Sequence, residues 1–288
     1  PLTIAWAAED NSTFSTWGTI LYGGKSVELS PPVWSPDGKL IALMERSTGI
    51  SAFKSFISII SPDGGTPERV YNNYTEITAE GVTFTIVHMP TYFGGFSPDN
   101  KYLYFSSRIY DESRGSYYIF KKLESGYSLS TGGPVSVVNR LDVSTGEVVE
   151  IAEGNWCKLS RSGKILLYGM YKKNTLAKNL ETGETWTLPE CYSNSSCITP
   201  DDKSVIYTAS ISDVQSTEGQ LYQIPITGGT AVRLTQYTNG GIFGRLRLFP
   251  DCSPDGKWVI YQDQNETISY SFHIGNRSGT VLQQVFFA

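Results

Sequence analysis

One short stretch, W-S-P-D-G-K at residues 34–39, returns four more times in altered form along the 288-residue chain. Each copy has an apolar residue, a hydroxyl residue, two positions that are usually Pro and Asp, a turn residue and Lys, and a β-rich run follows it. The copies are WSPDGK (34–39), FSPDNK (96–101), LSRSGK (159–164), ITPDDK (198–203) and CSPDGK (252–257). The third copy has Arg161 and Ser162 where Pro and Asp are usual. This recurrence predicts a chain built from repeated units.

The order of residues in each copy fits the corner of a β-hairpin. A common three-residue hairpin loop is a type I turn followed by a residue in the left-handed region. Pro presets φ at the first position of that turn, and Asp tolerates the second. The left-handed position then falls on residue types that accept positive φ, namely Gly38, Asn100, Gly163, Asp202 and Gly256. We therefore interpret the repeated acids as structural turn residues and not as a calcium or acid–base cluster; they are Asp37, Asp99, Asp201 and Asp255.

A second kind of turn, in which Gly lies between two alternating segments, follows each corner. It occurs at 61–70, 142–151, 179–188, 225–234 and 275–285, and a sixth copy at 21–29 has no corner before it. Four short strands in about 40 residues are the signature of a propeller blade. Helical periodicity of useful length is absent, so we predict an all-β fold: a six-bladed β-propeller of four-stranded antiparallel blades, the N-terminal one partial. We expect one domain over 1–288, with blades at about 2–30, 31–74, 92–153, 154–190, 193–237 and 247–287.

The apolar-S-P-D-G-K corner, followed by an aliphatic strand and by a later strand that ends in a T-G turn, resembles the WD-like repeat of the TolB family. The resemblance covers nearly the whole chain, from about residue 20 to the end, and implies a six-bladed propeller. It also implies contacts with protein partners at the mouth of the central channel. The same motif builds the propeller halves of prolyl oligopeptidase-like peptidases, oligogalacturonate lyases and many exported binding proteins, so it does not determine the function.

The intervals between successive corners are uneven, at 62, 63, 39 and 54 residues. The third interval is near the minimum for a blade, so the others contain additional loop. The additions fall at 46–54, 71–93, 109–134, 210–219 and 238–248. With the strands of a blade named A to D, the repeated turns are A–B and C–D connections, whereas every addition is a B–C or D–A connection. We therefore expect a ligand or partner to bind on the face opposite the repeated turns.

Aromatic residues in these additions supply the first candidate binding residues. Segments 71–93 and 109–134 contribute His88, Tyr92, Tyr110 and Arg114, because exposed Tyr and Arg are typical of protein and sugar contact surfaces. The alternative is that the aromatic side chains only pack the additions onto the blades.

Residues just before two of the corners supply the others. Arg245 and Arg247 alternate with apolar neighbours, so in a strand they share one face and could bind a carboxylate, or pair with an acid of a neighbouring blade. Counting back from Leu159 places Cys157 on the apolar side of its strand and Trp156 on the other. Trp156 is therefore a candidate contact at the channel mouth, unless it only fills space.

Composition argues against several classes of function. The formal charge of −5, a pI near 5.2 and the absence of a dense Lys/Arg cluster make nucleic acid a poor partner. No run of 18 apolar residues is present, so we predict no transmembrane segment. Nucleophile-elbow and phosphate-loop motifs are absent, and with two His in the chain we predict no catalytic residues, no metal site and no cofactor. A single His ligand helped by carboxylates stays open as an alternative.

Cysteines and glycosylation triplets indicate the cellular compartment in which the protein acts. Cys191 and Cys197 bracket a Ser/Asn-rich loop that could close as a small disulfide ring under oxidising conditions, with buried or free thiols as the alternative. Five N-x-S/T triplets favour an exported protein; they begin at Asn11, Asn73, Asn194, Asn265 and Asn276. The chain begins at Pro1, which fits a trimmed product, and we expect a periplasmic, cell-surface or extracellular location.

These observations together predict a non-catalytic, exported binding propeller that acts as a monomer. Its partner is expected to be a protein, or a glycan or peptide ligand, on the insertion-bearing face at the channel mouth. One alternative is a carbohydrate-active propeller, similar to oligogalacturonate lyase, that uses His88 or carboxylates. Another is a propeller that gates a peptidase domain outside this chain.

Overall fold

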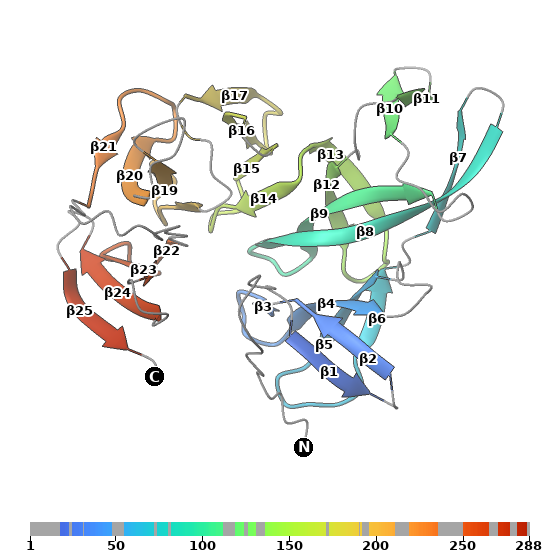
Figure 1. The fold of residues 1–288 in the computed structure, drawn as a ribbon, viewed down its shortest axis with the longest axis horizontal. Coiled ribbons are helices and arrows are strands. Elements are labelled where there is room, and N and C mark those ends of the chain that lie inside the picture. The colour runs from blue at the N-terminus through green and yellow to red at the C-terminus, as the bar shows by residue number, and fades with distance from the viewer. Residues whose placement is uncertain are drawn as a thin grey trace. The chain divides into compact units, whose positions relative to one another are not determined.

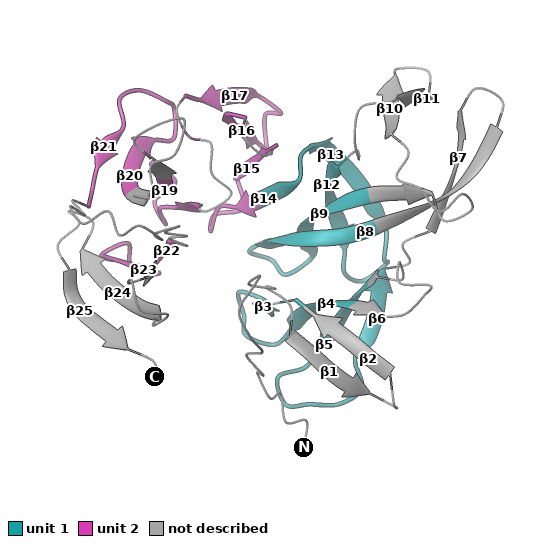
Figure 2. Cartoon of the chain, in the orientation of Figure 1, with its two compact units in different colours: residues 1–157 teal, residues 158–288 magenta. Residues whose placement is uncertain are grey.

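The computed structural model of the 288-residue chain describes parts of the sequence between residues 18 and 286. The described residues are 18–22, 25–30, 32–47, 55–71, 74–79, 82–111, 119–123, 126–130, 136–170, 173–189, 191, 196–210, 219–235, 250–264, 270–276 and 281–286. The chain divides into two compact units, residues 1–157 and 158–288, and each unit is described by itself (Figure 2). The regular elements in the described ranges are all β-strands, so the fold is all-β as predicted (Figure 1).

The first sheet of the first unit has six strands. They are β1 (Gly18–Tyr22), β2 (Lys25–Leu29), β3 (Val33–Trp34), β4 (Ile41–Ser47), β5 (Ser55–Ile60) and β6 (Glu68–Tyr71). Strands β2 and β3 both pair with β4, in the registers Leu29↔Glu45 and Val33↔Ala42. We assigned the hairpin of β1 and β2 to a partial blade over 2–30, but it joins the sheet of the first complete repeat. Residues 2–17 lie outside the described residues, so the partial blade stays a prediction.

The second sheet of the first unit has seven strands, in the spatial order β10-β11-β7-β8-β9-β12-β13. They are β7 (Tyr74–Ala79), β8 (Val82–Phe96), β9 (Tyr102–Asp111), β10 (Ile119–Leu123), β11 (Gly126–Ser130), β12 (Ser136–Asp142) and β13 (Val148–Glu153). Strand β7, the start of β8 and the hairpin of β10 and β11 come from the additions predicted at 71–93 and 109–134. Both additions therefore contain paired strands.

Three four-stranded antiparallel sheets follow along the chain. The third sheet has β14 (Trp156–Leu159), β15 (Ile165–Gly169), β16 (Thr175–Asn179) and β17 (Thr185–Leu188). The fourth has β18 (Ser196–Ile198), β19 (Ser204–Ser210), β20 (Gly219–Pro225) and β21 (Val232–Arg233). The fifth has β22 (Asp251–Cys252), β23 (Trp258–Gln264), β24 (Tyr270–Asn276) and β25 (Val281–Phe286). Within each of these sheets the strands pair in sequence order, which is the arrangement of a propeller blade.

The described residues thus form five sheets, in the order of the five complete repeats. A sixth blade, and a single domain over 1–288, stay predictions. The reason is that the described residues lie in two units and omit the first 17 residues.

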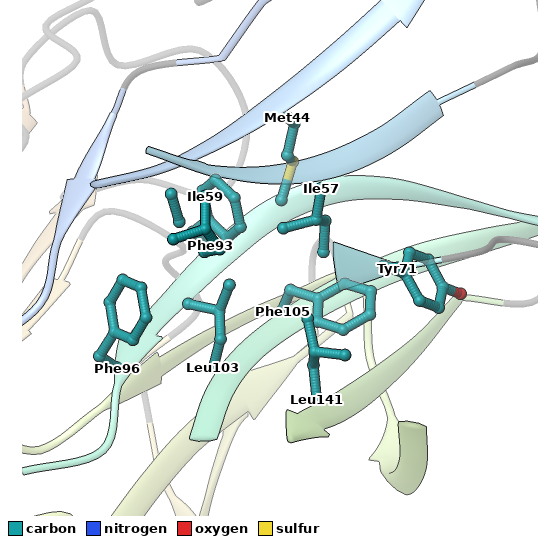
Figure 3. Packing of buried hydrophobic residues seen from close by; sticks show 10 residues of the cluster. Met44, Ile57, Ile59, Tyr71, Phe93, Phe96, Leu103, Phe105 and Leu141 are labelled. Atoms are coloured by element: carbon teal, nitrogen blue, oxygen red, sulfur yellow. The ribbon is translucent and has the colours of Figure 1, made fainter. Parts of the chain in front are cut away.

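An apolar core joins the two sheets of the first unit (Figure 3). Its residues come from β4, β5 and β6 of one sheet and from β8, β9 and β12 of the other; they are Ala42, Met44, Ile57, Ile59, Tyr71, Phe93, Phe96, Leu103, Phe105 and Leu141. Strand alternation produces this face, because Ala42 and Met44 are fully buried whereas Leu43 between them is half-buried. The rings of Tyr71 and Phe105 meet edge to face, with centroids 5.3 Å apart.

A second apolar cluster joins the fourth and fifth sheets in the second unit. It contains Cys197, Ile206, Leu221, Val259 and Tyr261. In β23 the buried residues Val259 and Tyr261 alternate with Trp258 and Ile260, which are 39% and 41% exposed. One face of β23 therefore packs on the fourth sheet, and the other is open in the described part of the unit.

Candidate binding face

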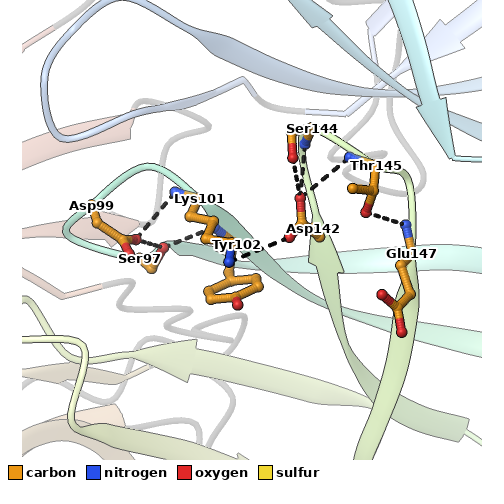
Figure 4. A network of polar contacts seen from close by, with 8 residues as sticks. All are labelled: Ser97, Asp99, Lys101, Tyr102, Asp142, Ser144, Thr145 and Glu147. Atoms are coloured by element: carbon orange, nitrogen blue, oxygen red, sulfur yellow. Dashed lines mark hydrogen bonds and ion pairs between the residues drawn. The ribbon is translucent and has the colours of Figure 1, made fainter.

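The corner between β8 and β9 shows how the repeated motif folds (Figure 4). The Ser97 N–H donates to the Tyr102 carbonyl at 2.7 Å, and the Asn100 N–H donates to the Ser97 carbonyl at 2.9 Å. The Ser97 hydroxyl donates to Asp99 Oδ1 at 2.5 Å and accepts from the Tyr102 N–H at 2.8 Å. Asp99 Oδ1 also accepts from the Lys101 N–H at 3.1 Å. The Ser97 hydroxyl and the Lys101 N–H together hold the pKa of the Asp99 carboxyl below its ordinary value.

Three other corners repeat these bonds, starting at Ser35, Thr199 and Ser253. In each corner the hydroxyl donates to the acid two residues later, at 2.6 or 2.7 Å, and accepts from the N–H five residues later. The residues at the predicted left-handed position have φ between 56° and 76°; they are Gly38, Asn100, Gly163, Asp202 and Gly256. The acids accept hydrogen bonds inside their own turns, which is the structural role expected of them; they are Asp37, Asp99, Asp201 and Asp255.

The third corner has Ser162 where the others have Asp, and a carboxylate from the next sheet lies beside it. The Ser162 hydroxyl accepts from the Lys164 N–H at 3.1 Å, as the acid does elsewhere. Asp202, from the fourth corner, accepts hydrogen bonds from the Ser160 hydroxyl at 3.3 Å and from the Ser162 hydroxyl. This contact joins two neighbouring corners of the second unit.

The second turn of a sheet lies beside its corner. An N–H of the second turn donates to the carbonyl of the corner Lys at 2.8–2.9 Å, in the pairs Val143–Lys101, Leu180–Lys164 and Ile226–Lys203. In the second sheet, Asp142 Oδ1 accepts from the Ser144 and Thr145 N–H groups, and Lys101 Nζ lies 3.8 Å from Asp142 Oδ2 (Figure 4). In these three sheets both turns therefore lie at one end of the strands. We call the end of any sheet that carries its repeated corner the corner end.

The second sheet continues past its blade at the opposite end. Pairing of β8 with β9 runs from Phe96↔Leu103, beside the corner, to Ile86↔Asp111, whereas β12 pairs with β9 only over residues 102–108. Strand β7 pairs with β8 over residues 82–87, and one parallel pair, Tyr127↔Ala79, joins β11 to β7. We call residues 74–90, 109–111 and 119–130 the extended end of the second sheet. The other predicted additions, 46–54, 210–219 and 238–248, lie almost entirely outside the described residues.

Two of the predicted binding residues, His88 and Tyr110, lie in the extended end, and a third, Tyr92, lies on the same ladder two residues beyond it. His88 pairs with Ile109, and Tyr110 pairs with Val87. Tyr92 is half-buried and follows a β-bulge in β8. The side chains of His88 and Tyr110 lie outside the described residues, so their binding roles stay predictions.

For Trp156, the structure corrects the prediction of a contact at the channel mouth. This residue is only 3% exposed, and Cys157 beside it is fully buried. Alternation along the strand predicted one packed face and one face toward the channel, but both faces of β14 are covered at this point. Trp156 therefore fills space, which was the alternative. Arg114, Arg245 and Arg247 lie outside the described residues.

A buried polar cluster at the β8 bulge was not predicted from the sequence. The Ser106 hydroxyl is fully buried, lies 3.0 Å from the Thr91 hydroxyl and donates to the Asn155 carbonyl at 3.0 Å. Beside it, Asn139 Nδ2 donates to the Ser107 hydroxyl at 2.9 Å. Two successive Ser directly after the apolar run 102–105 were the available signal, because buried hydroxyls need partners. The cluster ties β8 to β9 where the extended end begins.

The cysteines pair across two sheets. Cys197 of β18 forms a disulfide with Cys252 of β22, with their Cα atoms 6.3 Å apart. Cys157 and Cys191 are buried thiols. The possible ring between Cys191 and Cys197 is therefore not formed, because the packing of two neighbouring sheets brings a partner from 55 residues away to Cys197.

The described residues contain no group of three or more His, Cys, Asp or Glu that could hold a metal ion. In the same ranges, no helix is long and apolar enough to cross a membrane. The corner acids, as described above, accept hydrogen bonds within their own turns.

No protein-family model and no curated protein sequence matches the chain. Solved structures do match. TolB from Acinetobacter baumannii has a TM-score of 0.57 and 16% identity, over 90% of this chain and 54% of that chain. A candidate TolB from Agrobacterium tumefaciens has a TM-score of 0.59 and 19% identity, over 91% of this chain and 82% of that one. The β-propeller domain of the Trilobed protease from Pyrococcus furiosus has a TM-score of 0.51 and 14% identity, over 90% and 70%.

At these identities the match defines the fold alone. Together with the four-stranded antiparallel sheets, it identifies the chain as a β-propeller of the kind found in TolB and in peptidase propeller domains. The chain spans about half the length of the Acinetobacter TolB chain.

Proposed function

We propose that the chain is a non-catalytic binding propeller that contacts a protein partner at the end of its sheets opposite the repeated corners. The observation that carries the proposal is the difference between the two ends of the second sheet. At the corner end, the Asp99 and Asp142 carboxylates accept hydrogen bonds from their own turns. At the extended end, β7 and the long ladder of β8 and β9 add strand surface that the blade itself does not need.

The composition of the extended end supports a protein partner. Its strands and the segments between them contain Tyr74, Tyr110, Tyr117, Tyr118 and Tyr127. Tyr is enriched where proteins bind one another, because it provides a large rigid contact area and a hydroxyl with little loss of side-chain entropy. A glycan would also stack on such rings, so a glycan or peptide ligand is the second kind of partner that this end fits.

The disulfide of the chain fits a protein that acts in an oxidising compartment. The Cys197–Cys252 disulfide is a bond that persists in secreted and periplasmic proteins and is rare in the cytosol. The five N-x-S/T triplets point the same way. We therefore propose that the protein is exported and acts as a monomer.

Site-specific photo-crosslinking tests the proposal. A photoreactive phenylalanine analogue is placed at Tyr110, in the extended end, and in a second variant at Lys257, which is exposed at the corner end. After illumination of intact producing cells, we expect a discrete protein adduct from the Tyr110 variant and none above background from the Lys257 variant. Adducts from Lys257 alone, or from neither position, would contradict a protein partner at the extended end.

A second candidate function is a propeller domain that gates a peptidase. The observation that favours it is the match to the propeller domain of the Trilobed protease, of which this chain covers 70%. This function predicts a hydrolase domain in the same reading frame as the described propeller. Sequencing of that reading frame distinguishes the two candidates, since the binding function requires no such domain.

A further inference from the structure

The Cys197–Cys252 disulfide joins the first strands of two neighbouring sheets. Cys197 lies in β18, which has three residues, and Cys252 lies in β22, which has two. Few other backbone contacts hold these strands, since β22 pairs with β23 at only two register positions, Asp251↔Ile260 and Cys252↔Val259. The covalent bond is therefore placed where the β-ladder is shortest among the first strands of the second unit.

The apolar contact between the same two sheets includes the disulfide. Ile206 and Leu221 of the fourth sheet pack with Val259 and Tyr261 of the fifth, and Cys197 is one of the buried residues of this cluster. The disulfide thus joins a buried residue of this cluster to Cys252, which packs against the cluster.

The two sulfur-bearing residues differ in exposure. Cys197 is 1% exposed, whereas Cys252 is half-buried at the edge of the cluster. Disulfide exchange begins with attack of a thiolate on one sulfur, so access to the bond from solvent favours attack at the Cys252 side.

We propose that this disulfide is a redox latch that holds the fifth sheet on the fourth. A dithiol reductant attacks Cys252 Sγ through its thiolate, forms a mixed disulfide and releases Cys197 as a thiolate, which takes up a proton. The second thiol of the reductant then closes its own disulfide and releases the Cys252 thiol, so two electrons pass from the reductant to the bond. The reduced protein keeps the first unit intact but lets β22 and β23 separate from the fourth sheet.

Hydrogen–deuterium exchange of the full chain, with and without dithiothreitol, tests the latch. We expect reduction to raise the exchange rates of the amides of β18, β22 and β23 by at least roughly tenfold. The amides of β8, β9 and β12 in the first unit are the internal control and should keep their rates. The double variant Cys197→Ser/Cys252→Ser should exchange as the reduced protein does and should not respond to dithiothreitol.

A matched control uses the other buried cysteine of the second unit. Cys191→Ser should keep the full response to dithiothreitol, whatever its effect on stability, because its readout is the difference between oxidised and reduced samples. Non-reducing peptide mapping of the same samples should join the Cys197 and Cys252 peptides. Mapping of a different pair, four alkylatable thiols in the oxidised protein, or unchanged exchange in β22 and β23 on reduction would each overturn the latch.

Discussion

The two sheets of the first unit and the last two sheets of the second unit are held together by different means. In the first unit, described residues of β4, β5 and β6 pack on β8, β9 and β12 through aliphatic and aromatic side chains (Figure 3). In the second unit, the fourth and fifth sheets share a disulfide embedded in an apolar cluster. The first core has ten buried residues among the described ones, and the second cluster has five.

The two contacts thus differ in how many buried side chains they contain. With ten buried residues in the first core, burial alone can hold its two sheets together. One of the five buried residues of the second cluster is Cys197, and the disulfide adds a covalent restraint to this smaller contact.

The largest effect is expected from loss of an aromatic side chain at the centre of the first core. Phe105 is fully buried, and Phe105→Ala leaves a cavity, so it should lower the free energy of unfolding of the first unit by about 3–5 kcal/mol. This loss of unfolding free energy can be measured by urea unfolding, with hydrogen exchange of the β4 and β9 amides as the probe. Trp34→Ala is the control, because Trp34 is 54% exposed and should cost under about 1 kcal/mol. Equal effects of the two substitutions would mean that this core does not hold the sheets together.

Loss of the disulfide should have the next largest effect. Cys197→Ala with Cys252→Ala removes a link between residues 55 apart, and the second unit should lose about 2–4 kcal/mol of unfolding free energy. Urea unfolding of the oxidised wild type and of the double variant gives the difference. Stability of the first unit should not change. A loss of unfolding free energy in the first unit alone would contradict the assignment of the disulfide to the stability of the second unit.

Two glycines at equivalent turns separate backbone strain from contact between sheets. Gly146 and Gly183 have φ of 74° and 78°, so Ala at either position should cost about 1 kcal/mol. A Cβ on Gly146 would lie 2.8 Å from the Val70 carbonyl of the first sheet, whereas a Cβ on Gly183 would meet nothing within 4 Å. We expect Gly146→Ala to cost at least about 1 kcal/mol more in thermal or urea unfolding. Equal costs would show that the first two sheets do not approach each other closely at this turn.

The smallest effect concerns acid stability. Hydrogen bonds from the Ser97 hydroxyl and the Lys101 N–H lower the pKa of Asp99, so its contribution is present above the pKa of the unfolded chain, about 4. That contribution is lost as the pH falls through the lower pKa of the folded state. Asp99→Asn should therefore flatten the acid limb of the stability curve below about pH 4. Thr182→Ala is the control, because the neutral Asn179 side chain closes its turn, and it should leave the limb unchanged. Equal changes would contradict the role of the carboxylate.

The sequence was most informative where local chemistry decides the backbone. The left-handed positions at Asn100 and Asp202 followed from turn geometry, since a type I turn with a bulge requires positive φ at one defined position. The pairing of residues 18–29 with β4 did not follow, because a hairpin turn looks the same whichever sheet its strands join.

The candidate site was less predictable because it depends on contacts between sheets. Strand alternation assigned Trp156 a free face, yet alternation cannot tell whether that face is covered by other residues. Sequence spacing suggested that Cys197 pairs with Cys191, whereas its partner Cys252 comes from another sheet. The additions at 71–93 and 109–134 were located correctly as departures from the repeat, but their strands were not predicted.

Titration of the partner captured through Tyr110 measures how much the extended end contributes to binding. The variant that replaces residues 74–87 with a short Gly-Ser turn removes β7 and the first part of β8, and leaves every corner intact. Binding by calorimetry should weaken at least roughly a hundredfold, as expected when hot-spot residues are lost. The corner-end variant Lys39→Ala/Lys257→Ala, which changes exposed residues only, should bind within about twofold of the wild type. Loss of binding in the corner-end variant with full binding in the shortened one would contradict the assignment of function to the extended end.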